Sequence, residues 1–346
     1  MSGPPVELDE NDRVTTDGEV AASLRGVRLV RVSLRSAVER WSLAIAFVGA
    51  FVFFAVARPN VFLTWANARG ILDDASVLSL LAVGVTVVLV IGEFDLSVGF
   101  VVGLAAAAGV AAMSFHGWPW WVAVLLALGA GAVAGLANGV SVAILRIPSF
   151  IGTLAIGSIA AAIELAITKT SIFEGVSPRY VEIATTTIFG MPLRPIIAAG
   201  VALLFLVVLR TTVYGRHASS IGDNPAAARL AGVPATRVRV IAFMLTGLTA
   251  GLAGVFVTSS AGSYYPGLGT GYLLPAYAAA FLGLSLGGGL RFNVLGSYLG
   301  VLLLGMVTTG LTVMNQPSWI AALVQGLVLI AAVAGVALRR RGALGR

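Results

Sequence analysis

Apolar residues fill most of this chain in runs of roughly helical length, separated by short polar turns. A helix needs about 20 apolar residues to cross about 30 Å of hydrocarbon, and several runs are shorter than that. We therefore expect some of them to be tilted, broken or partly re-entrant. Ten apolar runs follow Arg40, at 41–57, 75–92, 97–115, 119–145, 149–168, 195–210, 240–260, 273–289, 294–313 and 318–338.

This pattern predicts an all-α polytopic membrane protein with about ten transmembrane helices. Backbone at membrane depth must form its hydrogen bonds internally, which favours helices, and the alternating pattern of barrel strands is absent. Composition agrees, because 58% of the residues are hydrophobic and only 11% are charged. A soluble domain carries about 25% charged residues.

The distribution of arginine and lysine predicts both termini in the cytoplasm, since most basic residues then face inward. That orientation requires an even number of crossings, so eight or ten would fit. The expected organisation is a cytoplasmic, partly disordered tail at 1–40, a transmembrane domain at 41–338 with a cytoplasmic loop at 211–239, and a short cytoplasmic tail at 339–346. Residues 21–40 are either a basic amphipathic helix on the membrane surface or a solvated leader. Residues 169–194 form an external polar loop.

Several reaction classes are excluded by residues that the chain lacks. There is no cysteine, there are two histidines, and the single lysine, Lys169, follows no glycine-rich phosphate loop. Thiol chemistry, a histidine-based zinc protease site and ATP binding by this chain are therefore excluded. We expect no catalytic residue, metal or cofactor. The net charge of +7 reflects basic residues scattered between apolar runs, which indicates membrane orientation rather than nucleic-acid binding.

Small residues recur at helical spacing and predict close helix packing. This interpretation is favoured over a role in contacting substrate. Two similar phrases, AGLANGV at 134–140 and AGLAGV at 250–255, hint at an internal repeat, and repeats of opposite topology are common in transporters. The glycines concerned are Gly131, Gly135, Gly139, Gly247, Gly251, Gly296 and Gly300.

The segment GEFDLSVG, at 92–99, places two carboxylates between two apolar runs. A charge at the bilayer centre costs at least about 2.5 kcal/mol, so such acids need a reason. Asp95 can accept backbone N–H groups at the start of the next helix, which favours a capped helix break over direct substrate contact. The break residues are Gly92, Glu93, Asp95, Leu96 and Ser97. Asn138 is the only Asn in the run 119–145, and we expect it either to line a path through the membrane or to tie two helices together.

The internal loop contains the pattern of a short helix outside the bilayer. Asn224 is placed to cap it, Pro225 suits its first position, and Gly232 suits its end. Such a helix either docks into a groove of a cytoplasmic partner or lies on the interface. The candidate residues for contact with such a partner are Asn224, Ala226, Ala227, Ala228, Arg229 and Gly232.

Five motifs in order resemble the ribose-type (monosaccharide) permeases of binding-protein-dependent ABC importers, over roughly residues 40–337. GEFDLSVG resembles GGxDLSVG, Arg146 to Leu154 resembles LPSFIVTLG, and Tyr214 to Gly232 resembles YGRxxxAIGxNEEAARLSG. Residues 59–67 match PNFLTxxN, and the last third follows the family's glycine-rich pattern. Glu93 replaces the second glycine of the first motif, which argues against ribose itself. Ala226 replaces the Glu of the coupling motif, and Gly283-Leu284-Ser285 departs from the usual Gly-Gly-Thr-Ser.

The resemblance implies a permease subunit in the cytoplasmic membrane of a bacterium that moves a monosaccharide or related polyol. Its implied partners are cytoplasmic ABC ATPase subunits that grip the 224–232 helix, an extracytoplasmic substrate-binding protein, a second permease subunit and membrane lipid, but no nucleic acid. One alternative is a branched-chain amino acid or nucleoside importer permease. Another is an ion-coupled secondary transporter or channel, which needs no ATPase.

Overall fold

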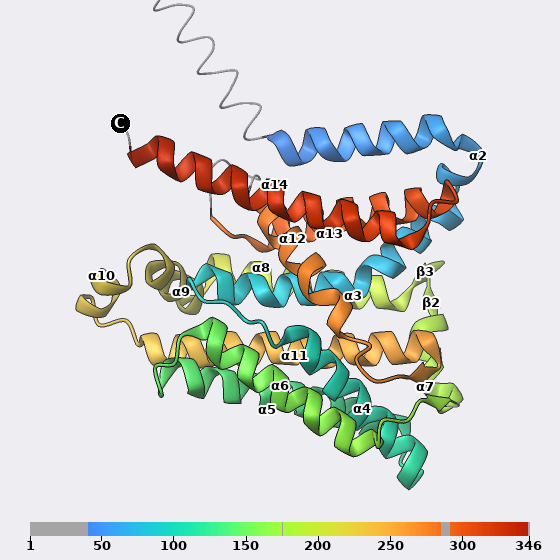
Figure 1. Cartoon of the computed structure of the whole chain (residues 1–346), viewed down its shortest axis with the longest axis horizontal. Helices are drawn as coiled ribbons and strands as arrows, with labels where there is room; N and C mark the ends of the chain where they lie inside the picture. Colours follow the sequence, from blue (N-terminus) through green and yellow to red (C-terminus); the bar gives the residue numbers. More distant parts are fainter. Residues whose placement is uncertain (1–40, 175, 285–290, 345–346) are drawn as a thin grey trace, which may run out of the picture.

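The computed structural model describes residues 41–174, 176–284 and 291–344. Helices account for almost all of its regular structure, and they lie roughly parallel to the long axis (Figure 1). Its elements are Trp41–Ala57, α2 (Pro59–Phe62), α3 (Trp65–Val90), α4 (Val98–His116), α5 (Trp120–Ala143), α6 (Ser149–Thr168), β1 (Phe173–Glu174), α7 (Pro178–Thr185), β2 (Thr187–Ile188), β3 (Met191–Pro192), α8 (Leu193–Thr211), α9 (Val213–Asp223), α10 (Pro225–Leu230), α11 (Ala235–Ala261), β4 (Ser263–Tyr264), η1 (Thr270–Tyr272), α12 (Leu273–Gly283), α13 (Val294–Val313) and α14 (Ser318–Leu344).

The protein is an all-α polytopic membrane protein, as the sequence predicts. Each of the ten expected runs contains a helix, and in the described residues seven helices are long and apolar enough to cross a membrane: α3, α4, α5, α6, α8, α11 and α13. The total of ten crossings and the location of the termini stay predictions. The expected tail at 1–40 lies outside the described residues. At the other end α14 continues to Leu344, past the expected boundary at 338.

Two small antiparallel sheets, β1–β4 and β2–β3, lie in or beside the stretch 169–194. The segment is therefore more ordered than the external loop expected from its polarity, and it includes the helix α7.

Helices α3, α4 and α11 form the interior, since more than half of the apolar window of each is buried inside the chain. Helices α5, α6 and α8 lie further out, with 28% of each window buried. Their exposed apolar faces suit contact with lipid or with another membrane subunit.

Glycine contacts bring α5 and α11 together backbone to backbone. A Cβ atom on Gly131 would lie 2.2 Å from the Gly247 carbonyl oxygen, and one on Gly247 would lie 2.1 Å from the Gly131 oxygen. Gly296 likewise meets Gly283, joining α13 to α12. The predicted packing role of these glycines is confirmed, because no larger residue fits at these contacts.

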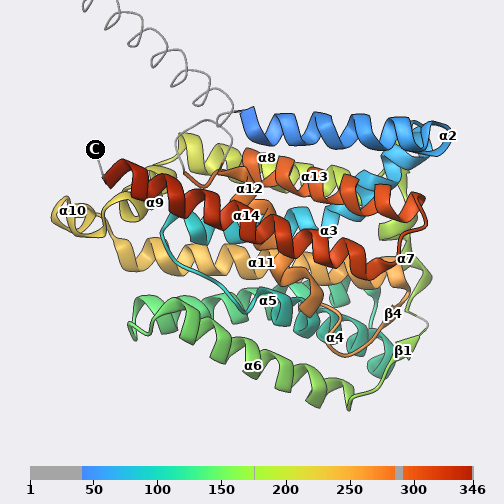
Figure 2. The same cartoon turned by 45° about the horizontal axis from the view of Figure 1, so that its top comes forward.

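Two chain segments leave the helical pattern inside the bundle. Gly92, with φ of +80°, turns the chain after α3, and residues 92–97 run back from the α9 end toward the middle, where α4 begins (Figures 1 and 2). From the opposite end, near α7, residues 262–272 fold inward and lead into α12. These two re-entrant segments produce the interior helix starts on which the candidate site depends.

Candidate functional site

Asp95 forms hydrogen bonds with Ser97, the residue that directly precedes α4. Its Oδ1 accepts hydrogen bonds from the Ser97 backbone N–H at 2.9 Å and from the Ser97 hydroxyl at 2.6 Å. The Asn138 amide donates to the same oxygen at 3.4 Å and to Ser97 Oγ at 2.7 Å. All three residues are buried. The expected contact of Asp95 with a backbone N–H is present, but it reaches Ser97, before the helix, and not the first N–H groups of α4, and Asn138 ties α5 to the break.

The backbone of the break is satisfied by side chains of other helices. Three consecutive N–H groups that no secondary structure could pair each find a hydroxyl acceptor from α6 or α12. Unpaired backbone at membrane depth would cost several kcal/mol per group, so these contacts make the break possible. The pairs are Phe94 N with Ser149 Oγ (3.2 Å), Asp95 N with the Tyr277 hydroxyl (2.8 Å) and Leu96 N with Thr153 Oγ1 (3.0 Å).

The other break residues differ in exposure. Leu96 is half-buried and packs against the core, whereas Gly92 is exposed at the turn. Glu93 lies between these environments, and its carboxylate Oε1 is 3.1 Å from Arg239 Nε on α11. Arg239 Nε makes no hydrogen bond to the described residues, so the contact is an ion pair without a directed N–H bond.

A cavity of about 840 Å³ opens beside the break, at the end of the molecule that carries α9. Three aromatic rings and four charged side chains contribute to it, and its walls come from α3, α8, α9, α12, α13 and α14. The lining includes Glu93, Phe94, Arg210, Asp223, Phe281, Arg291, Phe292 and Asn293.

The short helix predicted in the internal loop is present as α10, and it projects from one end of the bundle (Figures 1 and 2). Asn224 Oδ1 accepts from the N–H groups of Ala226 and Ala227 at 3.1 and 3.0 Å, and Pro225 occupies the first turn. The helix ends at Leu230, and Gly232 follows in the left-handed conformation with φ of +75°. The predicted cap and stop are therefore confirmed.

The surface of α10 is not uniform. Ala226, Ala227 and Arg229 are exposed, but Ala228 is only 4% exposed and belongs to a buried cluster that also contains residues of α3, α9 and α11. Ala228 thus holds the helix on the bundle rather than presenting a surface. Leu230, which the sequence analysis did not select, is 91% exposed. A large apolar side chain next to the helix stop was the available signal.

Helix α9 attaches the internal loop to α11 through the side chain of Tyr214. Burial raises the pKa of the Tyr214 phenol, which stays protonated and donates to the Val238 carbonyl at 3.4 Å.

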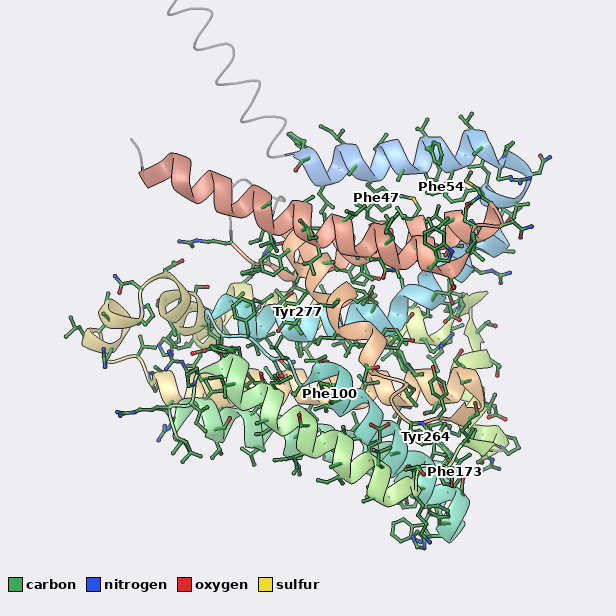
Figure 3. The ribbon with its side chains drawn as sticks, in the orientation of Figure 1. Phe47, Phe54, Phe100, Phe173, Tyr264 and Tyr277 are labelled. Atoms are coloured by element: carbon green, nitrogen blue, oxygen red, sulfur yellow. The ribbon has the colours of Figure 1, made fainter. Side chains whose placement is uncertain are left out.

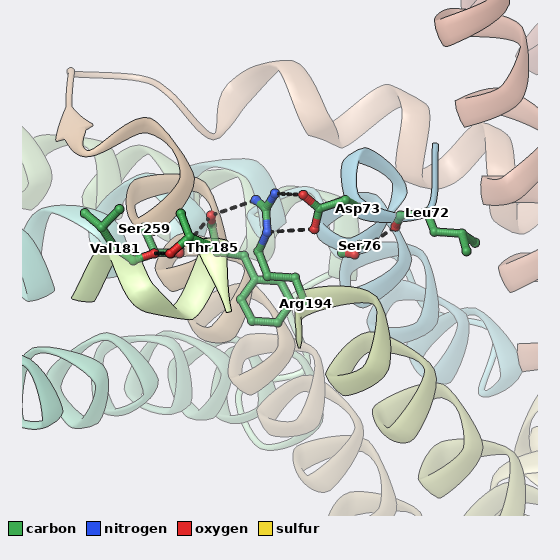
Figure 4. A network of polar contacts seen from close by, with 8 residues as sticks. Leu72, Asp73, Ser76, Val181, Thr185, Arg194 and Ser259 are labelled. Atoms are coloured by element: carbon green, nitrogen blue, oxygen red, sulfur yellow. Dashed lines mark hydrogen bonds and ion pairs between the residues drawn. The ribbon is translucent and has the colours of Figure 1, made fainter. Parts of the chain in front are cut away.

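A buried ion pair near the opposite end escaped the sequence analysis. Arg194 was assigned to an external loop, but it lies in the first turn of α8 and is only 6% exposed. Its guanidinium forms a two-pronged contact with the Asp73 carboxylate of α3 and also donates to the Phe256 carbonyl at 3.3 Å (Figure 4). Asp73 was missed because the apolar run was taken to begin at 75. The adjacent acids Asp73 and Asp74 were the available signal.

Glu164 on α6 performs for the second re-entrant segment what Asp95 does for the first. It is 2% exposed, and its Oε1 accepts from the Tyr264 hydroxyl at 2.8 Å and from Gly267 N–H at 2.9 Å. Space for its carboxylate exists because Gly103 on α4 has no side chain. Figure 3 shows Tyr264 beside Phe173, and their rings stack with centroids 6.1 Å apart.

These features define a polytopic helical membrane protein with two re-entrant segments. It has helices long enough to span a bilayer, two interior helix starts with satisfied backbone, and an exposed capped helix at one end. Within the described ranges no cluster of His, Asp and Glu could hold a metal ion.

Comparison with known proteins identifies the family. The model of the family described as branched-chain amino acid transport system / permease component matches residues 67–333. The ribose import permease protein RbsC of Escherichia coli K12 is 33% identical over 303 residues, 86% of this chain and 92% of that protein. RbsC of Bacillus subtilis strain 168 is 33% identical, with 83% and 90% covered. The autoinducer 2 import system permease protein LsrC of Enterobacter sp. strain 638 is 35% identical, with 82% and 83% covered.

The chain belongs to this family of ABC importer permeases and is of the ribose type. It is a translocation subunit rather than the ATPase, and it resides in the cytoplasmic membrane of a bacterium.

Proposed function

We propose that the chain imports a monosaccharide or related polyol, paired with a second permease subunit and driven by cytoplasmic ABC ATPases that bind α10. A binding protein delivers the substrate on the opposite side. Ten crossings with both termini in the cytoplasm then form the transmembrane part, 41–338. Asp95, Ser97 and Asn138 fix the break near the translocation path.

The observation that carries the coupling role is the exposure of α10 at one end of the bundle. Ala226, Ala227, Arg229 and Leu230 offer a small apolar and basic surface, while the buried Ala228 and the Asn224 cap hold the helix in one orientation. A rigid, protruding helix suits insertion into a groove of a partner. Its movement can bias the permease between inward- and outward-open states.

Three observations favour a neutral polyol over an amino acid. The buried charged side chains of the described residues are Asp95, Glu164 and Arg194, and each is occupied by a protein partner. A zwitterion would require free fixed charges at such depth. The aromatic rings of the cavity, including Phe94 and Phe281, provide flat surfaces suited to a sugar ring. Two of the relatives are ribose import permeases by name.

The test of coupling compares two substitutions of fully exposed apolar residues at opposite ends. Leu230→Glu on α10 should weaken binding of the ATPase subunits at least tenfold and abolish stimulated ATP hydrolysis in proteoliposomes. Phe189→Glu, in the β2–β3 turn, is the matched control because Phe189 is equally exposed. Equal ATPase binding by both variants would contradict the docking role of α10.

Orientation can be tested in the natural background because the chain contains no cysteine. Leu230→Cys should react with an impermeant maleimide only from the cytoplasmic side, and Phe189→Cys only from outside. Uptake assays with labelled ribose, other monosaccharides and leucine then separate the sugar proposal from the amino acid alternative.

A further inference from the structure

The first residues of the break at 92–97 contact the internal loop at 211–239, which we propose faces the ATPase. Gly222, near the end of α9, lies against the last turn of α3, where a Cβ atom on it would stand 1.9 Å from the Val90 carbonyl oxygen. Gly92 lies beside the same glycine. The backbone of α9 therefore meets the start of the break with no side chain between them.

A second contact joins the break to the other end of the loop. Glu93 is paired with Arg239, which lies in the early part of α11, shortly after α10 and its Gly232 stop. Both side chains are largely removed from solvent, at 17% and 27% exposure. An ion pair at this depth is screened less by water and salt than an exposed pair. The described residues form three ion pairs: Arg194–Asp73, Arg239–Glu93 and Arg291–Asp223. The pair Arg291–Asp223 involves the internal loop but not the break, and Arg194–Asp73 involves neither. Only Arg239–Glu93 joins the break to the loop.

Glu93 is also rigidly connected to the interior. Its N–H donates to the Val88 carbonyl at 3.1 Å, so it is fixed to the end of α3. Two residues further on, Asp95 holds α4 and α5 through Ser97 and Asn138. Displacing Glu93 must therefore strain the contacts that define the interior start of α4.

The geometry points to the Glu93–Arg239 ion pair as a positioning contact that transmits movement of α10 and α11 to the break at 92–97. This inference rests on the proposed function, because it requires an ATPase to move α10. The pair acts through other residues, and the transmission requires no contact between the pair and the substrate. Since Arg239 Nε makes no directed hydrogen bond, the sign of the charge matters more than the guanidinium shape.

A reporter in the break can detect this transmission. Phe94 is 42% exposed and lines the cavity, so Phe94→Cys provides the single thiol in a chain that otherwise has none. Its rate of maleimide alkylation is measured in proteoliposomes holding the permease–ATPase complex, without nucleotide and after trapping with ATP and vanadate. A parallel reporter, Ala227→Cys on α10, monitors the coupling helix itself.

We expect trapping to change the Phe94→Cys alkylation rate several-fold in the otherwise unchanged chain. Glu93→Gln and Arg239→Gln should each reduce this response about fivefold, the order expected for a partly buried ion pair. Arg239→Lys should keep the response, and the charge exchange Glu93→Arg with Arg239→Glu should restore it. The control Asp223→Asn removes the exposed Asp223–Arg291 pair and should leave the response intact.

The outcomes separate this inference from the proposed function. If Ala227→Cys responds to trapping and Phe94→Cys responds equally with and without Glu93→Gln, the ion pair does not transmit movement and the inference is overturned. If Ala227→Cys itself is unaffected by trapping, α10 does not couple to the ATPase and the proposed function fails as well. If Arg239→Gln lowers the response but the charge exchange and Arg239→Lys do not recover it, transmission does not depend on the ion pair and the inference is again overturned.

Discussion

The Tyr277 hydroxyl pairs with both backbone groups of Asp95: it accepts from the N–H at 2.8 Å and donates to the carbonyl at 2.9 Å. One side chain of α12 thereby replaces the two hydrogen bonds that a helix would have provided at that residue. The break before α4 is joined at this point to α12, the helix that follows the second re-entrant segment. Figure 3 places Tyr277 in the interior of the bundle.

Tyr277→Phe should destabilise the protein by about 1–3 kcal/mol, because it leaves a buried N–H and a buried carbonyl without partners. The measurement is thermal unfolding in detergent, with uptake in proteoliposomes as a second readout. Tyr265→Phe is the matched control, since Tyr265 is half exposed and its substitution should have little effect. An unchanged melting temperature for Tyr277→Phe would show that water or a neighbouring group satisfies the Asp95 backbone.

Substitutions of Asp95 should form an ordered series. Asp95→Asn retains an oxygen that can accept from Ser97 N–H but loses the charge, and hydrogen bonds to ionised acceptors are about twice as strong as neutral ones. Asp95→Ala removes the acceptor and should cost about 1 kcal/mol more than Asp95→Asn. Melting temperature and uptake should both decrease from the natural residue to Asn to Ala. Full uptake by Asp95→Ala would show that the Asp95–Ser97 contact is dispensable.

Removing one partner of the buried Asp73–Arg194 ion pair should destabilise the protein more than removing both partners. Arg194→Met leaves the Asp73 carboxylate without its partner in a largely apolar setting, and we expect a loss of about 3 kcal/mol. In Arg194→Met with Asp73→Leu the unpaired charge is also gone, so the double variant should be more stable than the single one. Unfolding in detergent of the natural chain, Arg194→Met, Asp73→Leu and the double variant forms a double-mutant cycle. A double variant less stable than Arg194→Met would contradict this assignment.

Two neighbouring glycines of α5 should respond in opposite directions to the same change. Gly131→Ala places a Cβ atom against the Gly247 carbonyl and should push α5 and α11 apart, lowering stability. Gly129→Ala has nothing within 4 Å of the new atom and should stabilise the helix by up to about 1 kcal/mol. Thermal unfolding distinguishes the two, and equal effects would show that α5 and α11 are not in close contact.

Local patterns predicted the helices well because their signals lie within a few residues. Asn224 and Pro225 start α10, Gly232 follows its end, and Asp95 binds the Ser97 N–H just before α4, each through interactions spanning three residues or fewer. Glycine spacing correctly indicated close packing, since only a side-chain-free position allows such contact.

The partners of buried polar groups could not be predicted. The charge of Arg194 led to the prediction that it lies in a loop. Its ion pair with Asp73, 121 residues earlier in the chain, instead holds its side chain inside the protein. Tyr277 lies 182 residues from Asp95, and nothing near either residue indicates the other. The sequence around Ala228 does not distinguish it from the neighbouring Ala226 and Ala227. Ala228 is nevertheless the one of the three that is buried, in a cluster with residues of α9 and α11.

The sequence by itself determined that the chain is a helical membrane protein, where its apolar helices lie and where the chain interrupts them, because hydropathy and turn patterns act over a few residues. The permease function followed from the resemblance of its motifs to a known family. Only the tertiary structure decided which distant hydroxyls satisfy the break, which charges pair, and which face of α10 stays exposed. Those outcomes depend on the positions of whole helices relative to one another, and helix packing is set by many weak contacts that no short pattern contains.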